Sequence, residues 1–242
     1  MSEVFKSVSE NLIFVLEFLG LVALMFLIAY GIEKAVKKKN GDTERILTTR
    51  KIAVIGVFSA IGAVLMALDL PVPFAPFFYS IDFSELPALI GGFAYGPVAA
   101  VMIEFCKVLL KLFIKPSSTA FVGELANFII GCTLVLPASI LYLLKRTKKR
   151  AIIGTLTGTL CMTVFGTVFN AVYLLPKFAQ MYGMPLEAII EMGTAIHASI
   201  HDVTGFVILC VAPLNILKGG LDSIITILVY KKLSPILKAS RK

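Results

Sequence analysis

The stretch from Leu86 to Ile114, LPALIGGFAYGPVAAVMIEFCKVLLKLFI, decides how the chain folds. It is predominantly apolar, and it is too long for one helix crossing about 30 Å of hydrocarbon, for which about 20 residues suffice. Gly91-Gly92 and Gly96-Pro97 interrupt it, and Gly-Pro is a natural turn. We therefore expect two short helices that meet at Tyr95-Gly96-Pro97.

The composition of the whole chain points to a lipid environment. Of its 242 residues, 58% are hydrophobic and 16% charged, with a mean hydropathy of +0.91. Average soluble domains are about 45–50% apolar and about 25% charged. An all-α integral membrane protein is expected, with no room for a sizeable soluble domain. The formal charge of +8 fits basic cytoplasmic loops, and no basic patch interleaved with aromatics suggests nucleic acid as a partner.

Basic clusters determine the topology. Lys34–Lys51, Lys145–Arg150 and Lys231–Lys242 are expected on the cytoplasmic side. Between the first two clusters the chain crosses an even number of times, so Leu86–Ile114 supplies two crossings. The other expected spans are Leu12–Ile32, Ile52–Leu68, Phe121–Leu144, Ala151–Leu175 and Pro213 to about Tyr230. The prediction is an N-terminal anchor and basic linker over residues 1–48, followed by six core spans over residues 49–242.

Two boundaries follow from this topology. Pro213 suits the first position of a helix, where its missing N–H costs nothing. Met184–Ala212 is therefore expected to be outer-face structure, partly helical. The outer loops would hold the acidic residues Asp69, Asp82, Glu85, Glu187, Glu191 and Asp202, together with His197 and His201.

Ionisable groups within spans are costly and therefore suggest function. Asn215, Lys218 and Asp222 share one face of the last span. Asn215 and Lys218 would lie in its first turns, where the lysine either extends to the membrane surface or donates to a ligand. Asp222 is expected to be a structural partner of a lysine one turn away.

Other spans carry further polar candidates. Glu104 and Lys107 share a face and form either an internal ion pair or ligand contacts. Lone Asn residues such as Asn127 and Asn170 often join helices. Several of them at one depth on different helices favour a shared polar pocket.

A proline-braced aromatic loop precedes these helices. It reads PVPFAPFFY from Pro71 to Tyr79. Interfacial aromatic belts account for single rings. The density here, with Phe78 beside Tyr79, favours a flat apolar surface that closes over a planar ligand.

Catalytic and metal motifs are weak or missing in the sequence. His197 and His201 have i, i+4 spacing, but Ala198 stands where a zincin has Glu, so no metal site is expected. No Walker A, G-x-S-x-G or paired catalytic carboxylate motif occurs. The chain is therefore expected to be neither an enzyme nor a holder of a cofactor, and any ATP hydrolysis must come from partners.

Several segments together are similar to one known family. The stretch SIDFSELPALIGGFAYGP from Ser80 to Pro97, with Glu104 and Lys107, resembles the riboflavin-specific S components of energy-coupling factor (ECF) transporters. Further matches are GELAN (123–127), NAVYLLP (170–176) and PLNILKG (213–219). The resemblance covers about Thr49 to Leu237.

This resemblance implies a six-helix S-component bundle in the cell membrane, here with one extra N-terminal transmembrane helix. It would bind riboflavin from outside, with FMN left open, and associate with a transmembrane coupling subunit and two ATPases. Asn170, Asn215 and Lys218 would hydrogen-bond the flavin under the aromatic loop. Small residues of the first core span, Gly56 and Ala60 or Ala63 and Ala67, would contact the coupling subunit.

Three alternatives stay open. The first is an S component for a different vitamin. The second is an intramembrane enzyme using His197, His201 and Asp202, or Glu104, although no third activating group is evident. A purely structural membrane subunit is the third, and it leaves the intramembrane Asn and Lys residues unexplained.

Overall fold

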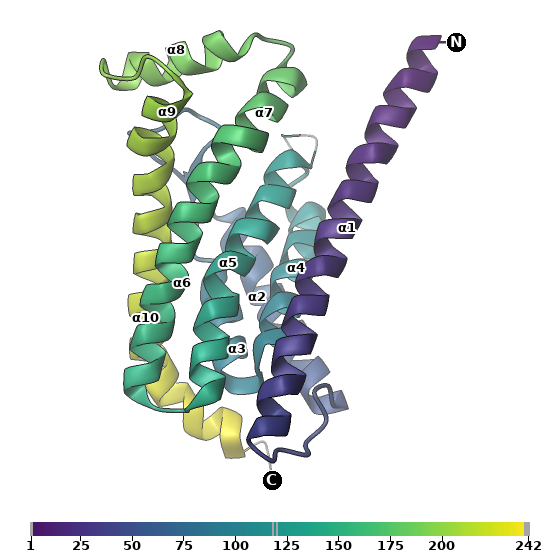
Figure 1. Cartoon of the computed structure of the whole chain (residues 1–242), viewed down its shortest axis with the longest axis vertical. Helices are drawn as coiled ribbons and strands as arrows, with labels where there is room; N and C mark the ends of the chain where they lie inside the picture. The colour runs from purple at the N-terminus through teal and green to yellow at the C-terminus, as the bar shows by residue number, and fades with distance from the viewer. Residues whose placement is uncertain (1, 118, 120, 240–242) are drawn as a thin grey trace.

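The computed structural model describes residues 2–117, 119 and 121–239, as a bundle of helices running roughly parallel to one long axis (Figure 1). The long helices are α1 (Ser2–Lys39), α2 (Thr49–Ala67), α4 (Pro97–Ile114), α5 (Val122–Leu144), α6 (Lys148–Phe169) and α10 (Ala212–Ala239). The shorter ones are α3 (Glu85–Tyr95), α7 (Leu175–Tyr182), α8 (Leu186–Ile196) and α9 (Val203–Phe206), with π-helical segments η1 (Asn170–Leu174) and η2 (Val207–Val211). The expected all-α membrane fold is confirmed.

Five helical segments of the described chain are long and apolar enough to cross a membrane. They are Leu16–Lys39, Thr49–Ala67, Val122–Leu144, Lys148–Tyr182 and Val203–Leu233. The two helices expected from the Leu86–Ile114 stretch are not among them. α4 has 18 residues but carries three charged side chains, and α3 has only 11 residues.

α3 and α4 meet at Gly96, as the sequence predicts. Gly96 has φ +105°, a conformation that favours glycine, and Pro97 starts α4. The Gly91-Gly92 pair does not interrupt α3, contrary to expectation. An added Cβ on Gly92 would lie 3.0 Å from the side chains of both Ala100 and Ser139. These glycines therefore permit close packing of α3 instead of ending it.

α3, the first of the two helices expected from this stretch, is too short to cross the hydrocarbon by itself. At 1.5 Å per residue, the 11 residues of α3 extend about 16 Å, roughly half of the hydrocarbon thickness. The connection between α2 and α3 contains the short antiparallel strands β1 (Leu70–Pro71) and β2 (Ser80–Ile81). Asp82 lies in this connection but is only 3% exposed, whereas Glu85 is 1% exposed and is the first residue of α3, so the loop position expected for Glu85 is wrong.

The last span starts earlier than predicted. Helical structure begins at Val203 and continues through η2 into α10, so the predicted start at Pro213 is wrong. A proline inside an α-helix clashes with the carbonyl four residues before it. In η2 the N–H of Ala212 donates to the carbonyl of Val207, five residues back, and this wider turn accommodates Pro213.

A second π-helical turn of this kind lies between α6 and α7. The N–H of Leu175 donates to the carbonyl of Asn170, five residues back, immediately before Pro176. The fifth span therefore continues past its predicted end at Leu175 to Tyr182. Between α7 and α9, α8 provides partly helical structure as expected for the first part of Met184–Ala212, whereas the residues from Val203 onward belong to the last span.

The extra helix α1 packs against α4 and α5 (Figure 1). Its two acidic side chains within the membrane have partners. A carboxylate oxygen of Glu33, which is 1% exposed, accepts the backbone N–H of Val98 at the start of α4, at 2.9 Å. Glu17 accepts the hydroxyl of Tyr173 at 2.7 Å. Glu33 and Glu17 therefore connect α1 to the bundle at two points along its length.

Candidate functional site

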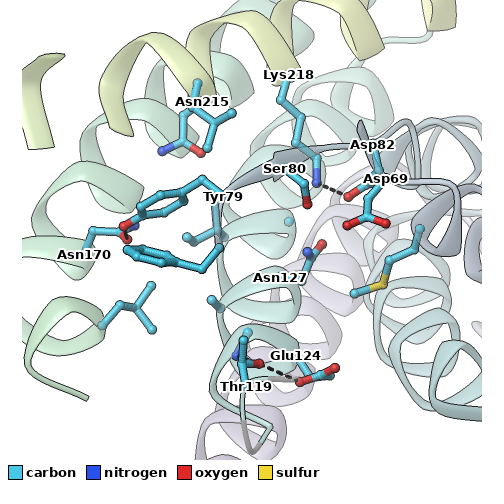
Figure 2. A pocket seen from close by; sticks show the side chains of 18 of the residues that line it. Asp69, Tyr79, Ser80, Asp82, Thr119, Glu124, Asn127, Asn170, Asn215 and Lys218 are labelled. Carbon is cyan, nitrogen blue, oxygen red and sulfur yellow. Dashed lines mark hydrogen bonds and ion pairs between the residues drawn. The ribbon is translucent and has the colours of Figure 1, made fainter. Parts of the chain in front are cut away.

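A cavity of about 170 Å³ opens inside the bundle, and Figure 2 shows the polar side chains around it. Its walls come from the α2–α3 connection, α4, α5, the end of α6 and α10. The polar lining consists of Asp69, Tyr79, Ser80, Asp82, Glu85, Lys111, Lys115, Thr119, Glu124, Asn127, Asn170, Asn215 and Lys218. The cavity thus joins segments from distant parts of the sequence.

Lys218 anchors the α2–α3 connection to α10. Its ammonium lies 3.0 Å from Asp82 (Figure 2) and also 3.0 Å from Glu85. Because an ammonium has three donors, Lys218 retains one for a third acceptor. One of the two alternatives expected for Lys218, that its side chain extends to the membrane surface, is wrong. The side chain is 7% exposed and lies well inside a helix that starts at Val203.

The ammonium of Lys107, unlike that of Lys218, has three partners. Its ammonium lies 2.8 Å from Glu104 and 3.2 Å from Glu85 and donates to the hydroxyl of Ser84 at 2.8 Å. Lys107 and Glu104 are completely buried, and neither lines the cavity. Of the two interpretations of this pair from the sequence, the geometry favours the internal ion pair.

An aromatic cluster borders the cavity on the α7 side. Phe78 packs against Tyr79 and Phe178, with ring centroids 4.8 and 5.1 Å apart. The Tyr79 hydroxyl donates to Asn170 Oδ1 at 2.6 Å, and Asn170 Nδ2 donates to the carbonyl of Gly166. The aromatic loop is therefore tied to the helix that carries Asn170.

Two amide groups facing the cavity have unused hydrogen-bonding capacity. Asn127 Oδ1 and Asn215 Nδ2 are buried and have no partner within the described chain. Gly166 allows this placement, because a Cβ there would lie 2.6 Å from Asn215 Nδ2. Buried polar atoms are normally paired, so these two are available to a ligand.

The outer rim of the cavity consists of ion pairs. Lys111 contacts Glu124 at 2.8 Å, and Lys115 pairs with Asp69. Glu124 also accepts the hydroxyls of Ser117 and Thr119. The cavity is also lined by residues that were not predicted as ligand contacts from the sequence, namely Asp69, Asp82, Glu85, Thr119 and Glu124. Only the acidic D-F-S-E segment could have indicated that Asp82 and Glu85 line the cavity. How deeply these two side chains are buried depends on how the α2–α3 connection folds inward.

The structure brings six of the eight predicted ligand residues to one cavity. They are Phe78, Tyr79, Asn127, Asn170, Asn215 and Lys218, while Glu104 and Lys107 lie behind the wall. The expected pairing of Asp222 with a lysine is wrong. Both carboxyl oxygens of Asp222 are buried without a hydrogen-bond partner, and Lys218 pairs with Asp82 and Glu85 instead.

The remaining predicted positions lie elsewhere. His197 and His201 are exposed in the connection between α8 and α9, and the described residues contain no cluster that could hold a metal ion. On α2, Gly56 and Ala60 are exposed, whereas Ala67 is half-buried and Ala63 is 1% exposed. Only the first pair thus presents an open small-residue surface.

This architecture, a helical membrane bundle with a polar cavity beneath an inward-folded connection, agrees with the family comparison. The model of the family "ECF transporter, substrate-specific component" matches residues 50–230. The chain belongs to this family. The matched region begins after α1, so the first helix is an addition to the family core.

Individual relatives extend the comparison. The chain is 32% identical to the riboflavin transporter RibU of Staphylococcus aureus (strain TCH60), over 78% of this chain and 93% of that protein. It is 31% identical to the riboflavin transporter FmnP of Bacillus subtilis (strain 168), over 81% and 97%. A solved structure described as the S component of a bacterial ECF transporter aligns with a TM-score of 0.60 and 34% identity, covering 78% of this chain and 97% of that one.

Proposed function

We propose that this chain captures riboflavin from the outside of the cell membrane and presents it to an ATP-driven ECF module. The observation that carries the proposal is the set of unused hydrogen-bonding groups around the cavity: Asn127 Oδ1, Asn215 Nδ2 and one proton of Lys218. Flavin is a flat, uncharged ring system with carbonyl acceptors and an imide donor. It fits a pocket that combines an aromatic wall with a few directed polar groups. Two relatives at 31–32% identity are named riboflavin transporters.

The cavity also distinguishes this proposal from the alternatives. An intramembrane enzyme needs activated groups that face its substrate, but Glu104 does not line the cavity, and His197 and His201 are exposed outside it. A structural subunit gives no reason for buried amide atoms without partners beside a cavity. The absorption spectrum of the protein purified from rich medium decides between riboflavin and a different vitamin as the ligand. Visible flavin absorbance is expected, and a colourless protein that also fails to bind added riboflavin would refute the proposal.

Asn215→Ala is expected to weaken riboflavin binding by about 5- to 150-fold, because a flavin group loses its buried partner at about 1–3 kcal/mol. Titration of purified protein, followed by quenching of flavin fluorescence, measures this change. His201→Ala is the control, since His201 is exposed outside the cavity. The same titration with FMN decides whether a phosphorylated flavin also binds. Full affinity in Asn215→Ala combined with lost affinity in His201→Ala would place the ligand near α8 instead.

Uptake is expected to require ATPase partners supplied in trans, because the sequence has no nucleotide-binding motif. Affinity at the nM level corresponds to about −12 kcal/mol, so a ligand so held leaves slowly without work. Gly56 and Ala60 on the exposed side of α2 are the proposed contact with the transmembrane coupling subunit, because small residues let helices approach closely. Vesicles containing this chain alone should bind riboflavin without accumulating it. Concentrative, ATP-dependent uptake by such vesicles would contradict the prediction.

A further inference from the structure

A second cavity, of about 250 Å³, lies at the opposite end of the bundle from the first. It is lined by Phe93 of α3, Tyr142 of α5, Lys148 and Ala151 of α6, and Ile227, Tyr230 and Lys231 of α10. On α6 the second cavity extends to Ala151 and the first begins at Met162, and on α10 the first extends to Lys218 and the second begins at Ile227, so the two cavities are separate along the bundle. The basic clusters place this end of the bundle on the cytoplasmic side.

The inner wall of this cavity is aromatic and apolar. Phe93 and Tyr142 have ring centroids 4.6 Å apart, and Tyr230 stands nearly perpendicular to Tyr142 at 5.6 Å and 87°. All three rings are buried, with 1%, 6% and 8% exposure. Ala151 and Ile227 complete the apolar lining. Such a wall does not suit a free, hydrated phosphate ion.

The edge of the cavity is strongly basic. Lys148 and Lys231 are both exposed, and neither takes part in an ion pair among the described residues. From Leu144 to Gly154 and from Ser223 to Leu233 the chain has no Asp or Glu, but it has Lys145, Arg146, Lys148, Lys149, Arg150, Lys231 and Lys232. Basic side chains in the first turn of α6 also face the positive end of the helix dipole, an arrangement that an anion would relieve.

We propose that this cavity binds an anionic phospholipid of the cytoplasmic leaflet, with its phosphate between Lys148 and Lys231 and its apolar part against the aromatic wall. The site lies at the level where such headgroups are found, and basic pockets between membrane helices on this side suit them. A lipid supplies both the negative charge and the apolar surface that the two parts of the cavity require. The riboflavin site takes no part in this binding, so the inference does not rest on the proposed function.

The test measures lipid binding to the full chain by native mass spectrometry, with phosphatidylglycerol and phosphatidylcholine as probes. The parent should retain phosphatidylglycerol preferentially. In the double variant Lys148→Gln/Lys231→Gln, affinity for phosphatidylglycerol should fall about 30-fold, since each lysine near the membrane surface contributes about 1 kcal/mol. The matched control is Lys149→Gln/Lys232→Gln. It removes the same charge from the next residues of the same helices, which are exposed but do not line the cavity, and it should bind as the parent does.

Two results would overturn the proposal. Equal losses in both double variants would mean that only the general surface charge attracts the lipid. Competition by inorganic phosphate at concentrations comparable to the lipid would mean that the aromatic wall contributes nothing. Because all four lysines are exposed, both variants should fold, and equal thermal midpoints without added lipid would verify this.

Discussion

Lys218→Met is expected to weaken riboflavin binding by about 10- to 150-fold, because a hydrogen bond from a charged group contributes about 1.5–3 kcal/mol. Asp82 and Glu85 occupy two of the three donors of Lys218, and the third is free to reach an acceptor in the cavity. Methionine keeps the length of the side chain and removes only the ammonium. The change therefore tests the charged group and not the packing of α10.

The same substitution also removes a structural counter-charge. Asp82, 3% exposed, would lose the lysine with which it pairs, and breaking a buried pair costs about 3–5 kcal/mol. The double variant Lys218→Met/Asp82→Asn avoids this cost, since the remaining acid Glu85 still pairs with Lys107. The double variant should recover most of the thermal stability of the parent without recovering its affinity.

Thermal unfolding in detergent and fluorescence titration with riboflavin measure the two effects separately. Asp222→Asn is the control on the same helix, because Asp222 is buried but does not line the cavity and has no hydrogen-bond partner to lose. That variant should bind riboflavin as the parent does. A Lys218→Met/Asp82→Asn protein with parental affinity would show that Lys218 supports the site without contacting the ligand.

Periodicity and charge predicted much of the helical framework. The turn at Gly96-Pro97 was deducible because an even number of crossings must separate two cytoplasmic clusters. Residues spaced by three or four on a helix share a face, so Asn215 and Lys218 were expected together, and both line the cavity. These inferences are local, and each needs only one helix or one count of crossings.

Depth in the membrane was harder to predict, because it depends on contacts between distant segments. Asp82 and Glu85 look like loop residues beside prolines and aromatics, yet the connection folds inward and pairs them with Lys218. Pro213 resembles a helix start, but the π-helical turn of η2 carries the helix through it. Both π-helical segments lie next to polar cavity residues: η1 begins with Asn170, and Asn215 follows η2 by four residues. Such segments are frequent at functional sites, and no helical periodicity shows them in advance.

Lys107→Met is expected to lower the free energy of unfolding by about 3–5 kcal/mol while leaving riboflavin affinity nearly unchanged in the protein that folds. Lys107 is completely buried, donates to Glu85 and Ser84, and has its ammonium 2.8 Å from Glu104 as an ion pair. No donor remains for a ligand, and the side chain does not line the cavity. This pattern is the opposite of that expected for Lys218→Met/Asp82→Asn, in which stability returns and affinity does not.

A second substitution keeps this prediction testable if Lys107→Met does not fold. In Lys107→Met/Glu104→Gln one of the two abandoned carboxylates becomes neutral, while Glu85 still contacts Lys218. The double variant should therefore regain a large part of the lost thermal stability, measured as the unfolding midpoint in detergent. Its affinity for riboflavin should lie within about threefold of the parent, because an exposed or uninvolved group contributes little to binding. A stable double variant that no longer binds riboflavin would contradict this prediction. The Glu104–Lys107 pair would then be part of the binding site, which is the other interpretation of the sequence. In that case the ligand would have to reach past Gly131 of α5, which separates Glu104 from the cavity.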